Sequence, residues 1–132
     1  MRLNPIAMRV ALAMFAACLG GLADGPRAQD AAQKVTGVAA WSQLVGNSIT
    51  GKEDGETLVE YYAPDGTAKS MRGNEISSGQ WALVGETICF RYGDEKEMEC
   101  YRLEVMGNTA TFTDKGGTGS RYEIVKGNPQ GL

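Results

Sequence analysis

The pattern of apolar residues predicts one short helix near the start of the folded part of the chain. Apolar side chains recur at helical spacing between Thr36, which suits an N-cap, and Gly46, which suits the left-handed position after a helix. We therefore expect a helix over residues 37–45 with Trp41 on its buried face. The positions that carry this spacing are Val38, Trp41, Leu44 and Val45.

After this helix the pattern changes to short segments of alternating polar and apolar residues, separated by Gly, Asn, Asp and Pro. Such alternation is typical of strands with one buried face, and the short spacers are typical of hairpin turns. The predicted strands are 48–51, 57–62, 67–72, 79–84, 87–92, 98–106, 109–114 and 120–126.

The lengths of the turns predict hairpin registers that agree on one buried face. This is a strict test, because a slip of one residue would exchange the two faces of a strand. Two-residue turns at 85–86 and 107–108 and longer loops at 93–96 and 115–119 bring the larger apolar side chains together. That face carries Trp81, Leu83, Ile88, Phe90, Tyr101, Leu103, Val105, Ala110, Phe112, Tyr122 and Ile124.

Two hairpins carry further expectations. The last loop pairs Phe112 with Tyr122, and the upstream Ala-Pro-Asp-Gly turn pairs Leu58 with Met71. The buried face of the upstream hairpin stays undecided, because both sets of alternate positions contain apolar side chains. Residues 73–78 are expected to form an open connection.

Eight short strands and one helix predict a mostly β fold. We expect a small antiparallel meander that forms a closed or half-closed, lipocalin-like barrel with one short N-terminal helix at its end. A twisted open sheet wrapped on the helix is the alternative. The tripeptide Gly79-Gln80-Trp81 is similar to the Gly-x-Trp signature of lipocalins, although it lies in the fourth predicted strand rather than the first.

The start of the chain is predicted to be a secretory signal peptide. Arg2 and Arg9 precede an uncharged apolar run over residues 10–22. This run is shorter than the ~20 apolar residues of a membrane-spanning helix. Small residues favour cleavage after Ala23, with a cut after Ala28 as the second choice. The chain is thus divided into a signal peptide (1–23), a flexible lead-in (24–35) and a single β domain (36–132).

Residues 15–18 support a competing interpretation, because they resemble a bacterial lipobox that would place a lipid anchor on Cys18. Phe15 stands where Leu or another aliphatic residue is usual, which weakens the match. Either route exports the protein, so we expect a periplasmic or secreted location and no membrane span.

Cys89 and Cys100 are the even pair that remains once Cys18 is removed with the signal. An exported protein meets an oxidising compartment, so this pair is predicted to form a disulfide. The register of their hairpin places the two residues directly opposite each other, within bridging distance. A metal site is a poor alternative, because the chain has no His and no CxxC motif.

The composition argues against several partners and chemistries. The whole chain has a net charge of −3, and removing residues 1–23 takes away two arginines and no acid, so the remaining domain is more acidic. Nucleic acids and anionic membranes favour basic surfaces, so neither is an expected partner. Without His, Ser and Cys lack their usual base. No cofactor is expected, because residues 115–119 match a hairpin turn better than a phosphate loop.

Carboxylates gather in two predicted loops, 53–56 and 94–99, where solvated charge is the simplest interpretation. Glu99 is the only acid that we place on the buried face. Aromatic side chains near the mouth of the barrel are candidates for a ligand site. The candidate lining residues are Tyr62, Trp81, Phe90, Tyr92, Glu99 and Tyr101.

Six short motifs stand out: 44–51 (LVGNSITG), 61–67 (YYAPDGT), 79–81 (GQW), 88–92 (ICFRY), 99–101 (ECY) and 127–129 (GNP). Together they resemble a domain-of-unknown-function family of small exported proteins from Gram-negative bacteria. The likeness covers roughly residues 36–129. It implies a periplasmic or secreted location and a Cys89–Cys100 bridge, and it implies no activity, cofactor or catalytic residue.

Three hypotheses for the function follow. The leading one is an exported non-enzymatic binding module whose partner is a small apolar ligand, held in a mostly apolar cavity, or another envelope protein. The rival is a proteinaceous inhibitor of an envelope or host hydrolase, similar to lysozyme inhibitors, with an acidic loop at 52–56 or 93–97 that enters the enzyme. The third is a hydrolase that uses two carboxylates in a cleft.

Intact-mass measurement of the exported protein tests the processing predictions. We expect a chain that starts at Asp24 and weighs two hydrogens less than its reduced form, because the cysteine pair is oxidised. A chain that starts at Gln29, or one that starts at a lipidated Cys18, would contradict the preferred cleavage site.

Overall fold

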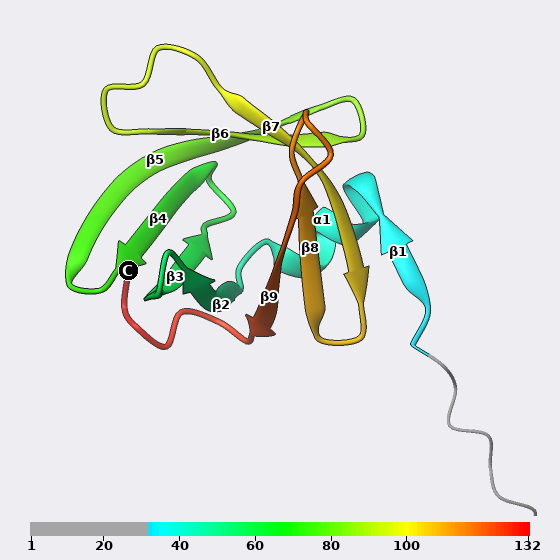
Figure 1. Ribbon diagram of the computed structural model, residues 1–132, viewed down its shortest axis with the longest axis horizontal. Coiled ribbons are helices and arrows are strands. Elements are labelled where there is room, and N and C mark those ends of the chain that lie inside the picture. Colours follow the sequence, from blue (N-terminus) through cyan, green and yellow to red (C-terminus); the bar gives the residue numbers. More distant parts are fainter. Residues whose placement is uncertain (1–31) are drawn as a thin grey trace, which may run out of the picture.

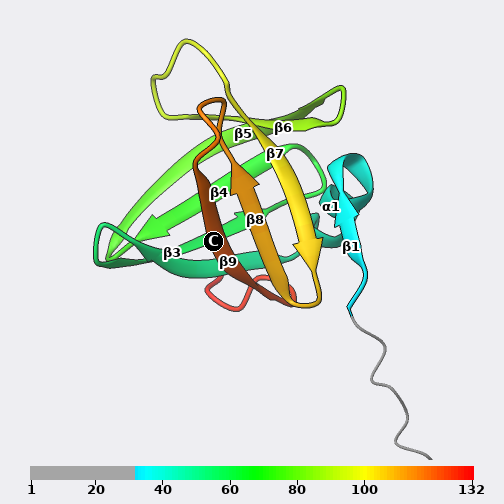
Figure 2. The same ribbon diagram turned by 45° about the vertical axis from the view of Figure 1, so that its right-hand side comes forward.

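The computed structural model describes residues 32–132 (Figures 1 and 2). The expected signal peptide, both cleavage sites and Cys18 lie outside the described residues. The one helix of the described part has eight residues, which is too short to cross a membrane. The elements are β1 (Lys34–Thr36), α1 (Gly37–Leu44), β2 (Ser48–Glu53), β3 (Glu56–Tyr62), β4 (Thr67–Arg72), β5 (Glu75–Val84), β6 (Thr87–Tyr92), β7 (Glu99–Met106), β8 (Thr109–Thr113) and β9 (Gly119–Val125).

The strands form a closed antiparallel barrel (Figure 2). Strands β2 to β9 follow one another around the wall in sequence order, and pairing of β2 with β9 closes the ring. One edge of β7 pairs with β6 as far as Arg102, which lies opposite the first residue of β6, and then with β1 from Glu104 to Met106. The expected meander and barrel are confirmed, and the open sheet is wrong.

Helix α1 ends one residue earlier than expected, and Gly46 follows it with a φ of +79°. Thr36 occupies the N-cap position, but its side chain makes no capping hydrogen bond. Instead the carboxylate of Glu86 accepts a hydrogen bond from the N–H of Val38 at 3.2 Å. A residue of the β5–β6 turn therefore satisfies the helix N-terminus that a local cap would otherwise satisfy.

The buried face of α1 packs into one end of the barrel. The Trp41 ring lies 4.8 Å from Tyr62, 5.0 Å from Trp81 and 5.9 Å from Phe90, measured between ring centroids. These distances are those of edge-on and tilted aromatic packing. The helix thus fills this end of the barrel with aromatic core, as the position of Trp41 in the sequence predicts.

The registers of β5–β6, β6–β7 and β7–β8 agree with the prediction, including Trp81 opposite Phe90 and Cys89 opposite Cys100. Most of the expected core face is buried or half-buried. Leu83 is an exception with 40% of its surface exposed, because it lies next to the last residue of β5 at the rim of the barrel.

The register between β3 and β4 differs from the prediction by one residue, so that Leu58 lies opposite Arg72 rather than Met71. The turn takes one residue more than expected, because the N–H of Ala63 donates to the carbonyl of Thr67 at 2.9 Å. The even-numbered residues of β3 face the interior, which answers the question that the alternation of this strand left undecided.

The register between β8 and β9 differs by two residues, so that Phe112 lies opposite Ser120 and not Tyr122. Asp114 closes the loop tightly: its carboxylate accepts from the N–H of Thr118 at 2.9 Å, and its own N–H donates to the Thr118 carbonyl. A shift of two residues leaves the faces unchanged, so Tyr122 still points inward.

Two segments that were expected to be irregular contain strand residues. The connection at 73–78 is only a tight turn, because Gly73 adopts a φ of +57° and β5 already begins at Glu75. Lys34 and Val35, which were expected in the flexible lead-in, belong to β1 and pair with β7. Neither segment has the length or alternation that marks a strand in a sequence.

Cys89 and Cys100 form the predicted disulfide between β6 and β7, with their Cα atoms 4.0 Å apart. Cys89 is buried and Cys100 is exposed. The bridge therefore holds together the two strands that flank the long loop at 93–98.

Reduction of the disulfide is expected to lower the free energy of unfolding by about 2.5–3 kcal/mol, the chain-entropy value for a loop of this length. Urea denaturation with and without reductant measures this change in the free energy of unfolding. The variant Cys89→Ala/Cys100→Ala should unfold like the reduced protein and should not respond to reductant. Equal urea midpoints for the oxidised and reduced wild-type protein would contradict this prediction.

Candidate functional site

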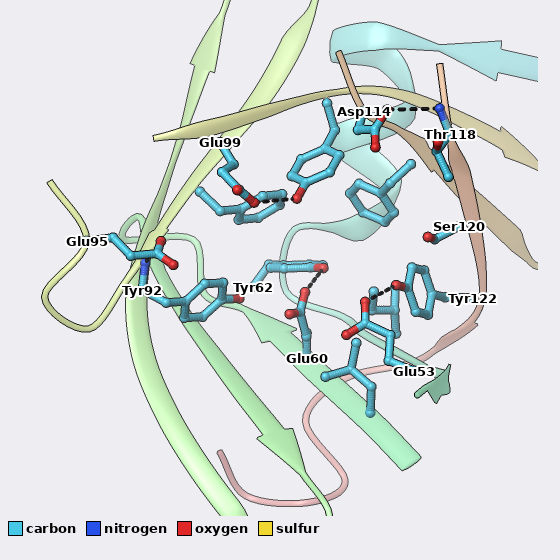
Figure 3. Close-up of a pocket in the computed structure, with 15 residues that line it drawn as sticks. Glu53, Glu60, Tyr62, Tyr92, Glu95, Glu99, Asp114, Thr118, Ser120 and Tyr122 are labelled. Carbon is cyan, nitrogen blue, oxygen red and sulfur yellow. Dashed lines mark hydrogen bonds between the residues drawn. The ribbon is translucent and has the colours of Figure 1, made fainter. Parts of the chain in front are cut away.

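A cavity of about 230 Å³ opens at the end of the barrel opposite α1 (Figure 3). Its wall comes from β2, β3, β6, β7, β8 and β9 and from the loops at 93–98 and 114–118. Six aromatic rings and five carboxyl groups line it, so the wall is both aromatic and acidic. The tyrosines and acids are Tyr62, Tyr92, Tyr101, Tyr122, Glu53, Glu60, Glu95, Glu99 and Asp114.

The aromatic rings form a continuous wall that also belongs to the core. The ring of Phe90 is at its centre, 5.4 to 6.4 Å from four neighbouring ring centroids. Phe112 extends the wall to Tyr122 at 5.9 Å. Because this wall is packed against the core, the polar groups that it carries are held in place. The four neighbours of Phe90 are Tyr62, Tyr92, Tyr101 and Phe112.

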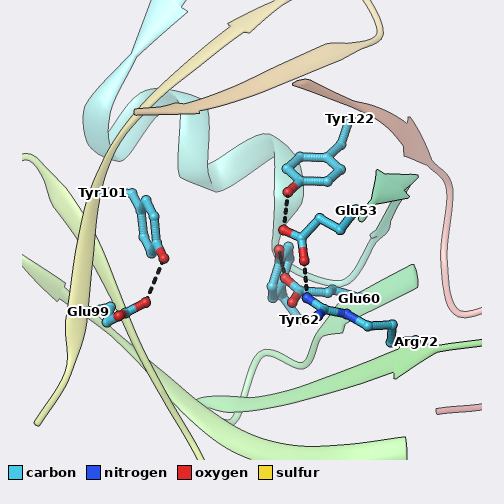
Figure 4. A network of polar contacts seen from close by, with 7 residues as sticks. All are labelled: Glu53, Glu60, Tyr62, Arg72, Glu99, Tyr101 and Tyr122. Carbon is cyan, nitrogen blue, oxygen red and sulfur yellow. Dashed lines mark hydrogen bonds and ion pairs between the residues drawn. The ribbon is translucent and has the colours of Figure 1, made fainter. Parts of the chain in front are cut away.

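Two Glu-x-Tyr sequences place a carboxylate and a phenol side by side on the inner face of a strand. In β3 the hydroxyl of Tyr62 donates to Oε2 of Glu60 at 2.6 Å, and in β7 the hydroxyl of Tyr101 donates to Oε2 of Glu99 at 2.8 Å (Figure 4). Residues i and i+2 of a strand share a face, which is why the same pairing arises twice. Neither carboxylate forms an ion pair within residues 32–132, and the hydroxyls of Tyr92 and Ser70 also approach Glu60.

A third pair of this kind joins strands that are far apart in sequence. The hydroxyl of Tyr122 in β9 donates to Oε1 of Glu53 in β2 at 2.7 Å, and Arg72 forms an ion pair with Oε2 of the same carboxylate (Figure 4). Gly51 makes room for this arrangement, since a Cβ there would lie 2.6 Å from the Tyr122 ring. The pair therefore depends on closure of the barrel between β2 and β9.

Glu60 is the cavity carboxyl whose ionised form is opposed by both burial and a neighbouring negative charge. Burial raises its pKa above the ordinary value of 4.5, and the negative charge of Glu53 raises the pKa further. The hydrogen bond from Tyr62 opposes this rise, because it stabilises the ionised form. Glu60 therefore gains protein contacts while losing water that would stabilise its charge.

The four tyrosine hydroxyls remain protonated donors. Burial raises the pKa values of all four phenols, and the carboxylates nearby raise these pKa values further. The hydroxyl of Tyr92 differs from the others, because it is buried without a well-formed hydrogen bond among the described residues, although the Glu60 carboxylate lies beside it. It faces the cavity close to Tyr62 and Glu60 (Figure 3).

The remaining two acids each use one oxygen to hold a loop. Glu95 accepts a hydrogen bond from the N–H of Tyr92 at 3.2 Å, and Asp114 accepts one from the N–H of Thr118. Both carboxylates thus belong to ordered loops at the mouth of the cavity (Figure 3).

The structure brings five of the six candidate lining residues together in this cavity. They are Tyr62, Phe90, Tyr92, Glu99 and Tyr101. Trp81 lies elsewhere: it packs against Trp41 at the helix end, and its indole N–H donates to the carbonyl of Ala63 at 2.8 Å. Trp81 lies directly opposite Phe90 in the register, so strand alternation alone does not separate it from the other five.

Glu99 is not the only acid on the inner face, so that expectation is wrong. Glu60 lies between two inward-facing apolar residues of β3, and Glu53 points inward from the end of β2. The expectation that the acids of 53–56 and 94–99 are solvated holds for Glu95 and Glu99, which are exposed although they line the cavity, whereas Glu53 is half-buried there. The repeated Glu-x-Tyr sequence was the available signal for Glu60.

The acidic wall does not favour the small apolar ligand that was one of the expected partners. An apolar ligand would remove water from the carboxylates without offering them hydrogen bonds, which is costly. No group of three or more acids or cysteines in residues 32–132 is arranged to hold a metal ion. The carboxylates are distributed around the wall rather than directed at one point.

Comparison with known proteins identifies no relative of this chain. No family model matches the chain, and no curated protein or solved structure is significantly similar to it. The resemblance to a family of small exported proteins therefore stays a prediction.

Glu60→Gln is expected to be more stable than the wild-type protein at neutral pH, because Gln keeps an acceptor for Tyr62 without a buried charge. The raised pKa of Glu60 means that the folded wild-type protein holds this proton as pH rises past 4.5. The stability contributed by the protonated form is then lost as pH passes the folded pKa. The advantage of the variant should therefore grow with pH and vanish in acid.

Urea denaturation at several pH values measures this difference. Glu104→Gln is the matched control, because Glu104 forms a surface ion pair with Lys34 at 2.7 Å on the outside of the barrel. Loss of this ion pair should be neutral or slightly destabilising at neutral pH, by about 0–1 kcal/mol. A stability difference for Glu60→Gln that does not change with pH would contradict the assignment.

Proposed function

We propose that the protein is an exported, non-enzymatic binding module of the cell envelope whose acidic end receives a positively charged partner. The observation that supports this is the convergence of carboxylates from the β2–β3 turn, the β6–β7 loop and the β8–β9 loop at one end of the barrel. These acids are Glu53, Asp54, Glu56, Asp94, Glu95, Glu97, Glu99 and Asp114.

The charge at this end is not balanced by neighbouring basic side chains. Lys52, Arg72, Lys96 and Lys115 are the basic residues of the same turns and strand ends, and Arg72 is engaged by Glu53. An acidic surface of this kind attracts and orients basic partners, most strongly at low ionic strength. A partner that supplies positive charge is therefore favoured over an anionic or apolar one.

The arrangement favours binding because its polar groups are held in place before any partner arrives. Three of the cavity carboxylates already accept a tyrosine hydroxyl, and the barrel that carries them is closed and bridged by a disulfide. Such preorganisation lowers the entropic cost of association. The disulfide also supports export, since disulfides persist in oxidising compartments.

The inhibitor hypothesis is favoured by the same end of the molecule. The two loops proposed to enter an enzyme, 52–56 and 93–97, both contribute to the cavity mouth, through Glu53 and Glu95. The β6–β7 loop also extends away from the barrel in both views (Figures 1 and 2). A basic hydrolase such as a lysozyme is thus the alternative partner.

Binding to immobilised lysozyme at low salt tests the proposal with a defined basic protein. We expect retention that weakens as salt is added. The rim variant Asp94→Asn/Glu97→Gln should weaken binding by about two- to thirtyfold, because two exposed pairs together contribute roughly 0.4–2 kcal/mol. Parallel assays of lysozyme activity separate simple binding from inhibition.

The control variant is Glu104→Gln/Glu123→Gln, which removes the same charge away from the acidic end. It should bind like the wild-type protein. No retention of the wild-type protein at low salt, or equal losses in the two double variants, would overturn the proposal.

A further inference from the structure

The three Tyr–Glu pairs of the cavity differ in one respect. In the Tyr122–Glu53 pair, the hydroxyl occupies one carboxylate oxygen and the guanidinium of Arg72 occupies the other (Figure 4). The molecule therefore shows what a carboxylate in this setting binds with its second oxygen: a planar organic cation. Arg–carboxylate pairing of this kind is the favoured geometry for guanidinium recognition.

The other two pairs have the same arrangement without the cation. Glu60 and Glu99 each accept a tyrosine hydroxyl at Oε2, and neither forms an ion pair within residues 32–132. Neither Oε1 atom has a positively charged partner, although the hydroxyls of Tyr92 and Ser70 lie near Glu60. Each of these two carboxylates thus has its tyrosine partner but lacks the cation that Arg72 supplies to Glu53.

The cavity presents hydrogen-bond acceptors and aromatic faces. Carboxylates accept only, and the phenols of Tyr62 and Tyr101 direct their protons to those carboxylates, which leaves their oxygen lone pairs for another donor. The Tyr92 hydroxyl is buried at the same wall beside Glu60, toward which it can turn its proton, and its oxygen can then also accept. A group with N–H donors and no acceptors is the complement of such a lining.

The aromatic wall adds an attraction that is specific for cations. The faces of Tyr, Phe and Trp rings attract ammonium and guanidinium groups within about 6 Å of the ring centroid. Phe90, Tyr92 and Tyr62 form adjoining rings beside Glu60, and Tyr101 adjoins Phe90 beside Glu99. Rings and carboxylates together favour an organic cation over a metal ion, for which no three carboxylates converge.

We propose that the cavity binds a single organic cation, a primary ammonium or a guanidinium group, through the Oε1 atoms of Glu60 and Glu99 and the hydroxyl of Tyr92. This deepens the proposed function, on which it rests, by assigning the chemical group that enters the acidic end. At about 230 Å³ the cavity is smaller than the ~300–1,000 Å³ of drug-sized sites, so it accepts the tip of a side chain or a short amine.

A bound cation also changes the protonation of Glu60. It would lie near both Glu60 and Glu53, whose mutual repulsion raises the pKa of Glu60. Positive charge there offsets this repulsion and lets Glu60 remain ionised. Binding should therefore weaken in acid, as Glu60 takes up a proton. The groups that face Glu60 are Tyr62, Tyr92 and Ser70, together with the charge of Glu53.

Titration of the isotopically labelled protein by NMR, with butylammonium and methylguanidinium as probes, tests this site. We expect shifts at the cavity residues and a dissociation constant of about 1 mM, typical of so small a ligand. Butanol and butyrate, which match butylammonium in size without its charge, should cause no saturable shifts at these residues.

Three variants locate the binding groups. Glu60→Gln and Glu99→Gln should each weaken cation binding by at least about tenfold, and Tyr92→Phe by about two- to fivefold, because it removes one neutral hydrogen bond. Glu104→Gln is the control, because Glu104 lies on the outside of the barrel in an ion pair with Lys34, so this variant should bind butylammonium like the wild-type protein. Thermal unfolding of each variant reports whether it is folded.

The source of the cation is decided by competition. If saturating butylammonium displaces immobilised lysozyme, the cation is a basic side chain of a protein partner; if the two bind together, the cation is a free amine. No binding of either cation, or equal binding of butanol, would overturn the site while leaving the proposed function standing if lysozyme still binds. Cation binding without lysozyme binding would overturn the protein partner and leave the site standing.

Discussion

Closure of the barrel is the constraint on which the rest of this structure depends. Once β2 pairs with β9, every second residue of each strand must point into a confined interior. Glu60 lies between Leu58 and Tyr62 on β3 and has no other direction to take. The hydrogen bond from Tyr62 is the local response to that constraint, because a buried carboxylate without a partner would be far more costly.

The same constraint makes the two ends of the barrel different. At one end α1 supplies Trp41, and the interior is filled by packed rings. At the other end the inward positions carry tyrosines and carboxylates around a cavity. The packed aromatic core and the cavity thus lie at different ends, and the aromatic wall around Phe90 belongs to both. Polar groups anchored to such a wall keep their geometry without needing a partner.

Local rules predict much of the wall. Two-residue turns leave little freedom, so the β5–β6 and β7–β8 registers follow from the positions of Gly85 and Gly107. The cysteine pair follows from the same reasoning. Prediction is wrong where a loop has other ways to close, as at Asp114, whose side chain bonds to Thr118 and makes the five-residue loop begin one residue earlier than expected. Such hydrogen bonds are decided by competition among several turns of similar energy.

The candidate site divides in the same way. Strand alternation alone determines that Glu99 and Tyr101 share a face, as do Glu60 and Tyr62, since residues i and i+2 of any strand do so. Only the folded barrel decides which of these faces is enclosed and brings Glu53 to Tyr122, because those residues meet through pairing of the first and last strands of the ring. A residue pattern specifies the neighbours within one strand, whereas the burial of a carboxylate depends on where the other strands go.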